Sequence, residues 1–286
     1  MNNSIEMKDV TKTYPNFKMT EVSLEVKKGT IMGLVGENGA GKTTLLKLIL
    51  NLINKENGSI RIFDKDNQKE EKLIKEDIGV VLDDSFFSEY FTPVQIGNMM
   101  KKFYRNWDQA LFDSYLTTFQ LPSRQKVKEF SRGMRMKLQI ATALSHHPKL
   151  LLLDEPTSGL DPIVRSEILD IFMNFIQDEE NSILLSTHIT SDLEHIADYI
   201  TFINQGQIIF SKSRDELLEN YAIIKVSDQE FKKISPNDII RFKKNRYDTE
   251  ILIDNKRTFK KKYPSFNIEK ANIEDIMILY IKGEIL

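Results

Sequence analysis

A glycine-rich segment constrains the fold of this chain more than any other part of its 286 residues. Residues 36–44 read GENGAGKTT and satisfy the pattern G-x-x-x-x-G-K-[ST]. The apolar run at residues 31–35 predicts a buried strand, and leucines at helical spacing over residues 43–52 predict a helix. A strand, a glycine turn and a helix in that order begin a parallel α/β unit.

The same segment predicts a binding site for phosphate groups. Glycines allow the backbone to turn its N–H groups inward, and the N-terminus of the helix adds positive partial charge. The Lys42 ammonium would reach the β- and γ-phosphates of a nucleotide, and the Thr43 hydroxyl would hold Mg²⁺. A glycine turn that precedes a lysine by chance is the alternative, but the position between strand and helix favours nucleotide binding. The nucleotide contacts expected in this segment are Gly36, Asn38, Gly39, Ala40, Gly41, Lys42, Thr43 and Thr44.

Two carboxylates follow a second apolar run, at residues 150–153. At the carboxyl end of a buried strand, Asp154 would hold Mg²⁺ directly or through water. Glu155 is then a candidate general base for the attacking water. An apolar strand that ends in Asp-Glu is often only the start of a loop, so this interpretation depends on the glycine-rich segment. His188 follows the apolar run 183–185 and either contacts the γ-phosphate or is a structural hydrogen-bonding residue.

Strands that alternate with helices predict a mostly parallel sheet. The first thirty residues have the pattern of short strands, whereas residues 85–145 are mostly helical in character and predict an inserted helical subdomain. Residues 221–286 carry 14 Lys and Arg against 10 Asp and Glu, while the whole chain carries 40 against 42. This shift predicts a boundary near Asn220, between a domain of residues 1–220 and a small C-terminal domain.

Composition excludes several classes of protein. The chain has no cysteine, which excludes a disulfide framework, a thiolate metal site and a cysteine nucleophile. Its net charge of −2 lacks the basic footprint of a general nucleic-acid binder, so no nucleic-acid partner is expected. No apolar run reaches the length of about 18 residues that a membrane helix needs, and no signal peptide is visible, which predicts a cytoplasmic protein.

In this order, the motifs resemble those of the ATP-binding subunits of ABC transporters. The segment FSRGM stands where the family has its signature L-S-G-G-Q, with Ser131 placed 23 residues before Asp154. The segment SGLD that ends at Asp161 matches the D-loop of the family. His188 matches the switch histidine, and Tyr14 matches the aromatic residue that stacks on adenine.

The resemblance covers residues 1 to about 220 and implies an ATPase with an α/β fold. The implied fold is a P-loop NTPase core with a mostly parallel sheet, an N-terminal antiparallel β subdomain, an inserted helical subdomain and a small C-terminal α+β extension. Two subunits, identical or related, would form an ATP sandwich in which Ser131 and Gly133 of one contact the γ-phosphate held by the other.

The family pattern also implies the cofactors ATP and Mg²⁺ and a division of roles among the site residues. The implied catalytic residues are Lys42, Glu155 and His188. Tyr14 and Asp161 join the nucleotide contacts. The implied magnesium ligands are Thr43, Asp154 and Asp83.

Two places depart from the family pattern. Asp83 stands where the family has its Q-loop glutamine, and Arg132 and Met134 replace a glycine and the glutamine of the signature. Ser131 and Gly133 remain, so we expect ATP hydrolysis to be retained. A weakly hydrolysing regulatory subunit is the alternative.

An integral membrane permease is the implied partner, so the protein would lie at the cytoplasmic face of the cell membrane. Docking is expected near Phe86, Phe87, Tyr90 and Phe91, although part of this cluster would also suit the core of the helical subdomain. The leading hypothesis is the motor of a bacterial exporter of amphipathic or antimicrobial peptides, of the bacitracin-resistance, YtrB-like or phenol-soluble modulin type. A soluble ABC-type ATPase that acts on ribosomes is the alternative, but the chain has one phosphate loop and no long charged linker.

Overall fold

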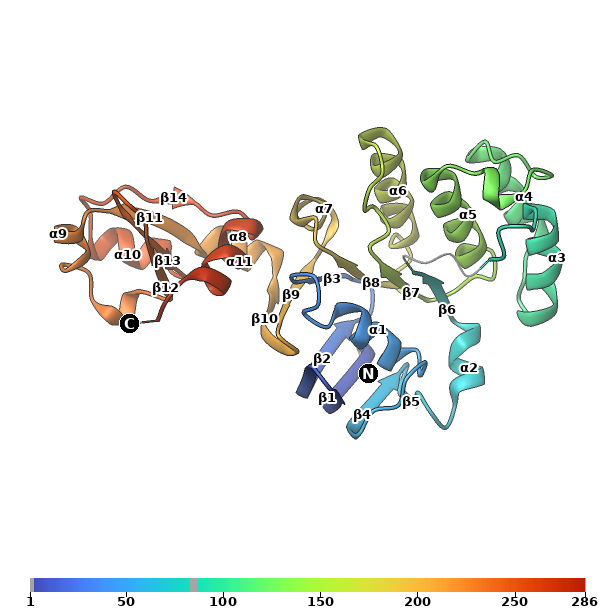
Figure 1. Cartoon of the computed structure of the whole chain (residues 1–286), viewed down its shortest axis with the longest axis horizontal. Coiled ribbons are helices and arrows are strands. Elements are labelled where there is room, and N and C mark those ends of the chain that lie inside the picture. Colours follow the sequence, from blue (N-terminus) through green and yellow to red (C-terminus); the bar gives the residue numbers. More distant parts are fainter. Residues whose placement is uncertain (1–2, 83–86, 286) are drawn as a thin grey trace.

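The computed structural model describes residues 3–82 and 87–285 and contains three β-sheets with helices packed on them (Figure 1). The largest sheet has six strands, and four of its neighbouring pairs are parallel. In spatial order the strands are β10 (Gln207–Ser213), β9 (Tyr199–Asn204), β3 (Ile31–Val35), β8 (Ser182–Thr187), β7 (Leu150–Asp154) and β6 (Ile78–Val81). This sheet confirms the prediction of a mostly parallel α/β core.

An antiparallel sheet built from the N-terminal part of the chain covers one side of this core. Its strands in spatial order are β2 (Phe17–Lys27), β1 (Asn3–Tyr14), β4 (Asn57–Ile62) and β5 (Lys65–Asp66). Helix α1 (Lys42–Ile49) lies between the two sheets, because its Leu45 and Leu46 are buried together with Met7 of β1 and Leu34 of β3. The helix ends earlier than the sequence pattern over residues 43–52 predicts.

The stretch after β6 is mostly helical and has a core of its own. Ile96, Phe112 and Leu138 are buried in this core, and Thr92 and Gln95 form a capping box at its first helix. The helices on this side of the molecule are α2 (Glu71–Glu76), which precedes β6, then α3 (Pro93–Phe103), α4 (Gln109–Thr118), the 3₁₀ turn η1 (Val127–Glu129) and α5 (Arg132–Leu144).

Two further helices follow strands of the large sheet directly. Helix α6 (Pro162–Phe175) comes after β7, and α7 (Thr190–Ile196) comes after β8. Phe172 of α6 and Leu193 of α7 are buried against the sheet. Strand β8 pairs in parallel with β3 on one side and with β7 on the other, so the loops after these three strands meet at one edge of the sheet.

Residues 214–285 form a C-terminal part with a sheet of its own. Figure 1 places this part and the α3–α5 helices at opposite ends of the molecule. Its antiparallel sheet has the strand order β12, β13, β11, β14, and Ile224, Ile251 and Phe259 belong to its separate core. The elements are α8 (Arg214–Asn220), β11 (Ala222–Val226), α9 (Asp228–Phe231), η2 (Pro236–Asp238), β12 (Arg241–Lys244), β13 (Thr249–Ile253), α10 (Lys256–Lys262), β14 (Glu269–Lys270) and α11 (Ile273–Lys282).

Helix α11 packs this C-terminal part against the large sheet. Ile273 and Ile276 are buried in the same hydrophobic cluster as Phe202 of β9, and the Tyr280 ring centroid lies 5.3 Å from that of Phe210. The backbone N–H of Ile273 donates to Glu194 of α7 over 2.8 Å. Across residues 3–82 and 87–285, no helix has both the length and the apolar character needed to cross a membrane.

Candidate active site

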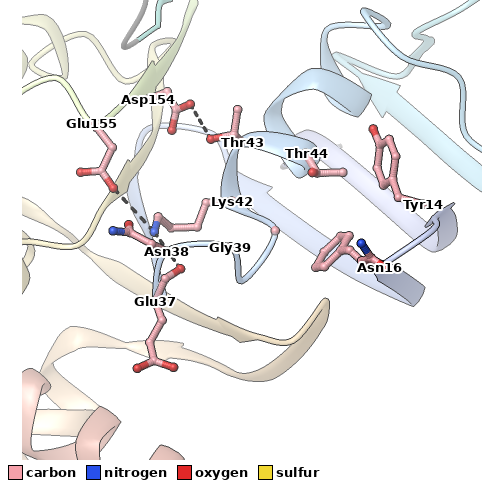
Figure 2. Close-up of a pocket in the computed structure, with 12 residues that line it drawn as sticks. Tyr14, Asn16, Glu37, Asn38, Gly39, Lys42, Thr43, Thr44, Asp154 and Glu155 are labelled. Atoms are coloured by element: carbon pink, nitrogen blue, oxygen red, sulfur yellow. Dashed lines mark hydrogen bonds and ion pairs between the residues drawn. The ribbon is translucent and has the colours of Figure 1, made fainter.

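A cleft of about 580 Å³ opens where α1, the end of β1 and the end of β7 meet (Figure 2). It brings together most of the residues that the sequence predicts for nucleotide binding. Its lining residues are Tyr14, Asn16, Phe17, Glu37, Asn38, Gly39, Gly41, Lys42, Thr43, Thr44, Asp154 and Glu155. Ala40, also predicted, is buried beside this lining, and its carbonyl accepts the N–H of Gly206 over 2.9 Å.

The glycine-rich loop has a conformation that only glycine adopts easily. Gly39 and Gly41 have φ angles of +82° and +114°, and a Cβ at Gly41 would lie 2.8 Å from Cζ of Phe17. A Cβ at Gly36 would lie 2.3 Å from the carbonyl oxygen of Ile203. The loop therefore wraps tightly against β9 and β2 and leads into the N-terminus of α1, whose N–H groups carry positive partial charge.

Lys42 places a buried cation at the inner end of the cleft. The side chain is only 6% exposed, and its Nζ donates to the carbonyls of Gly36 over 2.7 Å and of Glu37 over 3.3 Å. The same Nζ lies 3.6 Å from Oε1 of Glu155. An ammonium held this way is positioned to neutralise phosphate oxygens that enter the cleft.

Thr43 and Asp154 supply oxygen atoms of the type that magnesium prefers. The Thr43 hydroxyl donates to Oδ2 of Asp154 over 2.8 Å, and Asp154 is only 3% exposed (Figure 2). The Ser186 hydroxyl donates to the other carboxylate oxygen, Oδ1. Because both donors are neutral, Asp154 keeps its charge available for a hard cation, so the donor set fits Mg²⁺. Asp83, the third predicted magnesium ligand, lies outside the described residues.

Glu155 is held on both sides of its carboxylate. Oε1 faces Lys42, while Oε2 lies 2.7 Å from Nδ1 of His188 and accepts the His188 backbone N–H over 3.3 Å. The backbone of Glu155 has a φ of +52°, a left-handed conformation that is strained for a residue with a Cβ. Its own N–H donates to the carbonyl of Ser186 over 2.9 Å. The structure thus orients this carboxylate at the edge of the cleft, next to the phosphate loop.

Tyr14 lies at the mouth of the cleft, where a flat base would enter. Its ring is 39% exposed, and its centroid lies 6.4 Å from the ring of Phe17. Lys12 Nζ lies 5.4 Å from the centroid of the Tyr14 ring. An exposed aromatic face beside the phosphate loop is suited to stacking on adenine.

Five further predicted residues do not line this cleft. Gly36 and His188 contact its lining residues Lys42 and Glu155, whereas Ser131, Gly133 and Asp161 lie elsewhere. Ser131 is the exposed N-cap of α5, and its hydroxyl accepts the Met134 N–H over 3.2 Å. Asp161 caps α6 by accepting the N–H groups of Ile163 and Val164, both over 3.1 Å. Gly133 packs beside Val164, since a Cβ there would lie 3.3 Å from its side chain. The structure therefore groups these residues with one another, at the starts of α5 and α6.

Sequence reasoning missed four residues at the site. Asn16, Phe17 and Glu37 line the cleft, and Ser186 bonds Asp154. Glu37 lies inside the glycine-rich pattern at a position where any residue is allowed. Ser186 stands opposite Asp154 in the parallel pairing of β7 and β8, so its position at the end of an apolar strand was the available signal.

Comparisons with known proteins point to the same family that the sequence motifs resemble. Residues 19–158 match the family model described as ABC transporter. The chain is 30% identical over 224 residues to the ABC transporter ATP-binding protein YtrB of Bacillus subtilis, covering 78% of this chain and 76% of the relative. It is 34% identical over 235 residues to the bacitracin transport ATP-binding protein BcrA of Bacillus licheniformis, covering 80% and 77%. A solved ATP-binding subunit of an ABC transporter superposes with a TM-score of 0.68 at 26% identity, covering 75% of this chain and 92% of that one.

The fold and the cleft define a P-loop ATPase with an antiparallel sheet and a helical insertion around its core. With the relatives included, the assignment becomes specific: this chain belongs to the family of ATP-binding subunits of ABC transporters. It therefore binds and hydrolyses ATP. These findings confirm the resemblance and do not favour the ribosome-acting alternative.

Proposed function

We propose that this chain powers an exporter of amphipathic or antimicrobial peptides. The support is its similarity to BcrA, a protein named for bacitracin transport, over 77% of that relative. The phosphate loop, Asp154 and Glu155 also line one cleft, with His188 bonded to Glu155. The single observation that supports its motor role, ATP hydrolysis, is the carboxylate of Glu155, held between Lys42 and His188 beside the phosphate loop.

In this proposal the residues of the cleft divide the work of hydrolysis. Lys42 and the N–H groups of the loop offset the negative charge of the β- and γ-phosphates. Thr43 and Asp154 would hold Mg²⁺, which would supply positive charge to stabilise the phosphates. Glu155 orients the attacking water and accepts its proton, while His188 keeps the Glu155 carboxylate in place and donates to the γ-phosphate.

We further propose that the second ATPase subunit, identical or related, completes each site. Ser131, Gly133 and Asp161 are exposed or half-buried and lie away from the cleft of their own chain, which suits contacts across an interface. Ser131 begins the thirteen-residue helix α5, so the positive end of that helix would face the γ-phosphate held by the partner.

The permease is proposed to dock near Phe86, Phe87, Tyr90 and Phe91, at the cytoplasmic face of the membrane. Tyr90 and Phe91 are 61% and 37% exposed, whereas Phe87 packs partly into the helical core. Phe86 lies outside the described residues. At the C-terminal end of α3, a cleft of about 690 Å³ is lined by exposed Phe103 and Leu73 together with charged residues of α2 and α3. An apolar surface of this kind is typical of protein–protein contacts.

Domain limits are also proposed: an ATPase domain of residues 1–220, with a helical subdomain at about 85–145, and an accessory domain of residues 221–286. A separate hydrophobic core and an independent sheet in the last part support this division. Helix α11 belongs by sequence to the accessory domain, although its buried face packs on the ATPase domain.

A genetic experiment in the source organism tests the exporter function. Loss of the gene is expected to increase sensitivity to at least one member of a panel of amphipathic and antimicrobial peptides that includes bacitracin. Wild-type protein and the surface control Asp170→Asn should restore resistance, whereas Glu155→Gln should not. Unchanged sensitivity to the whole panel would contradict the proposed substrate class.

Fractionation of the same cells tests the place of action. Tagged wild-type protein is expected in the membrane fraction together with a protein of several membrane spans. Recovery with ribosomes and absence from membranes would contradict the permease partnership.

A further inference from the structure

A buried carboxylate that the hydrolysis scheme does not use joins the segment that follows His188 to the loop that follows Glu155. Asp192, on α7, is 1% exposed. Its Oδ2 accepts the Thr157 hydroxyl over 2.6 Å, and its Oδ1 accepts Nε of Arg165 over 2.6 Å. Nη2 of Arg165 lies 2.5 Å from the same Oδ1, which makes the contact bidentate on the guanidinium side.

These three side chains, the Asp192 cluster, come from three different segments. Thr157 is two residues after Glu155 in the loop that follows β7, and it is 1% exposed. Arg165 lies in the first turn of α6, which Asp161 caps. Asp192 is four residues after His188. The cluster therefore ties the loop of Glu155 and the start of α6 to the segment of His188.

The same two segments meet again at the catalytic pair itself. There Oε2 of Glu155 lies 2.7 Å from Nδ1 of His188. The His188 backbone N–H also donates to Oε2, and the Glu155 N–H donates to the carbonyl of Ser186, so these contacts join the two segments close to the strand ends. The Asp192 cluster attaches the segments a second time, two residues beyond Glu155 and four residues beyond His188.

Breaking this second attachment has a high free-energy cost. Burying a carboxylate is costly unless it is paired and fully hydrogen-bonded, and in Asp192 both oxygens have donors. Removal of one partner leaves a buried charge or a buried donor unsatisfied. The Arg165 guanidinium is further held by the Ser191 hydroxyl, to which Nη2 donates over 2.7 Å.

We propose that Asp192 is a positioning residue for ATP hydrolysis. Through Thr157 and Arg165 it holds Glu155 and His188 in their positions relative to each other. It therefore affects the hydrolysis rate and not the nucleotide affinity. The inference rests on the proposed roles of Glu155 and His188. None of the three cluster residues lines the cleft, so their effect on nucleotide binding is expected to be small.

The test compares ATPase kinetics of the purified chain and its variants. Asp192→Asn and Thr157→Val are each expected to lower kcat about 10- to 100-fold, since a displacement of about 1 Å at a catalytic group has effects of that size. KM and the Kd for ATP should stay within about twofold of wild type. Thr157→Ser keeps the hydroxyl and should retain most of the activity, as should the control Asp170→Asn on the exposed face of α6.

Thermal unfolding of every variant accompanies the kinetics. Equal loss of kcat and ATP affinity would mean a merely structural role and overturn the proposal, as would a normal kcat in Thr157→Val. If Asp192→Asn does not fold, the comparison of Thr157→Val with Thr157→Ser decides alone, because that pair differs in the hydroxyl and leaves the charges intact.

A double variant distinguishes a failure of this inference from a failure of the proposed role of Glu155. If Asp192 acts through Glu155, Glu155→Gln combined with Asp192→Asn should be no slower than Glu155→Gln alone, because the effects are not additive. A further 10-fold loss in the double variant would overturn the inference. A wild-type rate in Glu155→Gln would instead overturn the proposed role of Glu155 itself.

Discussion

The carboxylate of Glu155 lies between a cation and an imidazole: Oε1 is 3.6 Å from Nζ of Lys42, and Oε2 is 2.7 Å from Nδ1 of His188. Both partners orient the group toward the cleft in which the phosphates are expected. Glu155→Gln keeps the size of the side chain but removes its ability to take a proton. We expect turnover to fall by roughly 10²- to 10⁴-fold with ATP affinity retained.

Because ATP then persists at the interface, Glu155→Gln should also accumulate as a dimer when ATP is added. Size-exclusion chromatography with and without ATP measures this, alongside phosphate release. Hydrolysis at the wild-type rate would show that Glu155 is not the general base.

Lys42→Ala is expected to weaken ATP binding. The buried ammonium makes charge-assisted hydrogen bonds, each worth about 1.5–3 kcal/mol, so the Kd should rise at least about tenfold. Lys47→Ala is the matched control, because Lys47 is exposed on the same helix. Titration with a fluorescent ATP analogue gives both affinities. Equal affinities for the two variants would contradict the phosphate-loop assignment.

Local sequence signals were enough to predict the parts of the site that lie within single segments. The glycine-rich loop carries its own pattern, and the pair Asp154 and Glu155 follows an apolar run directly. Their proximity in space follows from the parallel strand order β3, β8, β7, in which β8 pairs with both of the strands that precede these residues. The proposed roles of these residues stay predictions until the variants are measured.

Contacts between distant segments could not be predicted in this way. The bond from Ser186 to Asp154 depends on the register of β7 and β8. Asp192 and Arg165 are 27 positions apart, and in the sequence they look like ordinary surface charges. Only the tertiary packing of α6 on α7 pairs them and buries Asp192.

Gly36→Ala is expected to destabilise the chain through a clash with the backbone. The added Cβ would lie 2.3 Å from the carbonyl oxygen of Ile203, and neither group is the end of a flexible side chain. Overpacking of this kind costs about 1–3 kcal/mol. Urea denaturation measures the loss in the free energy of unfolding.

Gly39→Ala provides the comparison for this effect. Apart from Gly39 itself and its two neighbours in the chain, no heavy atom of the described residues lies within 4 Å of the Cβ that it would add, but its φ is +82°. It should therefore lose only about 1–2 kcal/mol, from backbone strain. A larger loss in Gly39→Ala than in Gly36→Ala would contradict the packing argument.

His146 should make the stability of the fold depend on pH. Burial lowers the pKa of its imidazole below the ordinary value of 6.5, although Nε2 lies 3.0 Å from the carbonyl oxygen of Ile78. The ring also stacks on Tyr104, with centroids 3.9 Å apart. The unfolded chain therefore binds a proton at a higher pH than the folded one. The contribution of His146 to stability is fully present above about pH 6.5 and is lost as the pH falls below that value.

Urea denaturation at pH 7.5 and at pH 5.5 measures the change in the free energy of unfolding. His146→Phe keeps a flat ring against Tyr104 but cannot take up a proton, so the loss of stability between the two pH values should become smaller than in wild type. His195→Asn, which changes an exposed histidine on α7, should leave the wild-type dependence unchanged. If His146→Phe loses as much stability as wild type over this range, the buried imidazole is not a source of the acid sensitivity, and other groups must carry it.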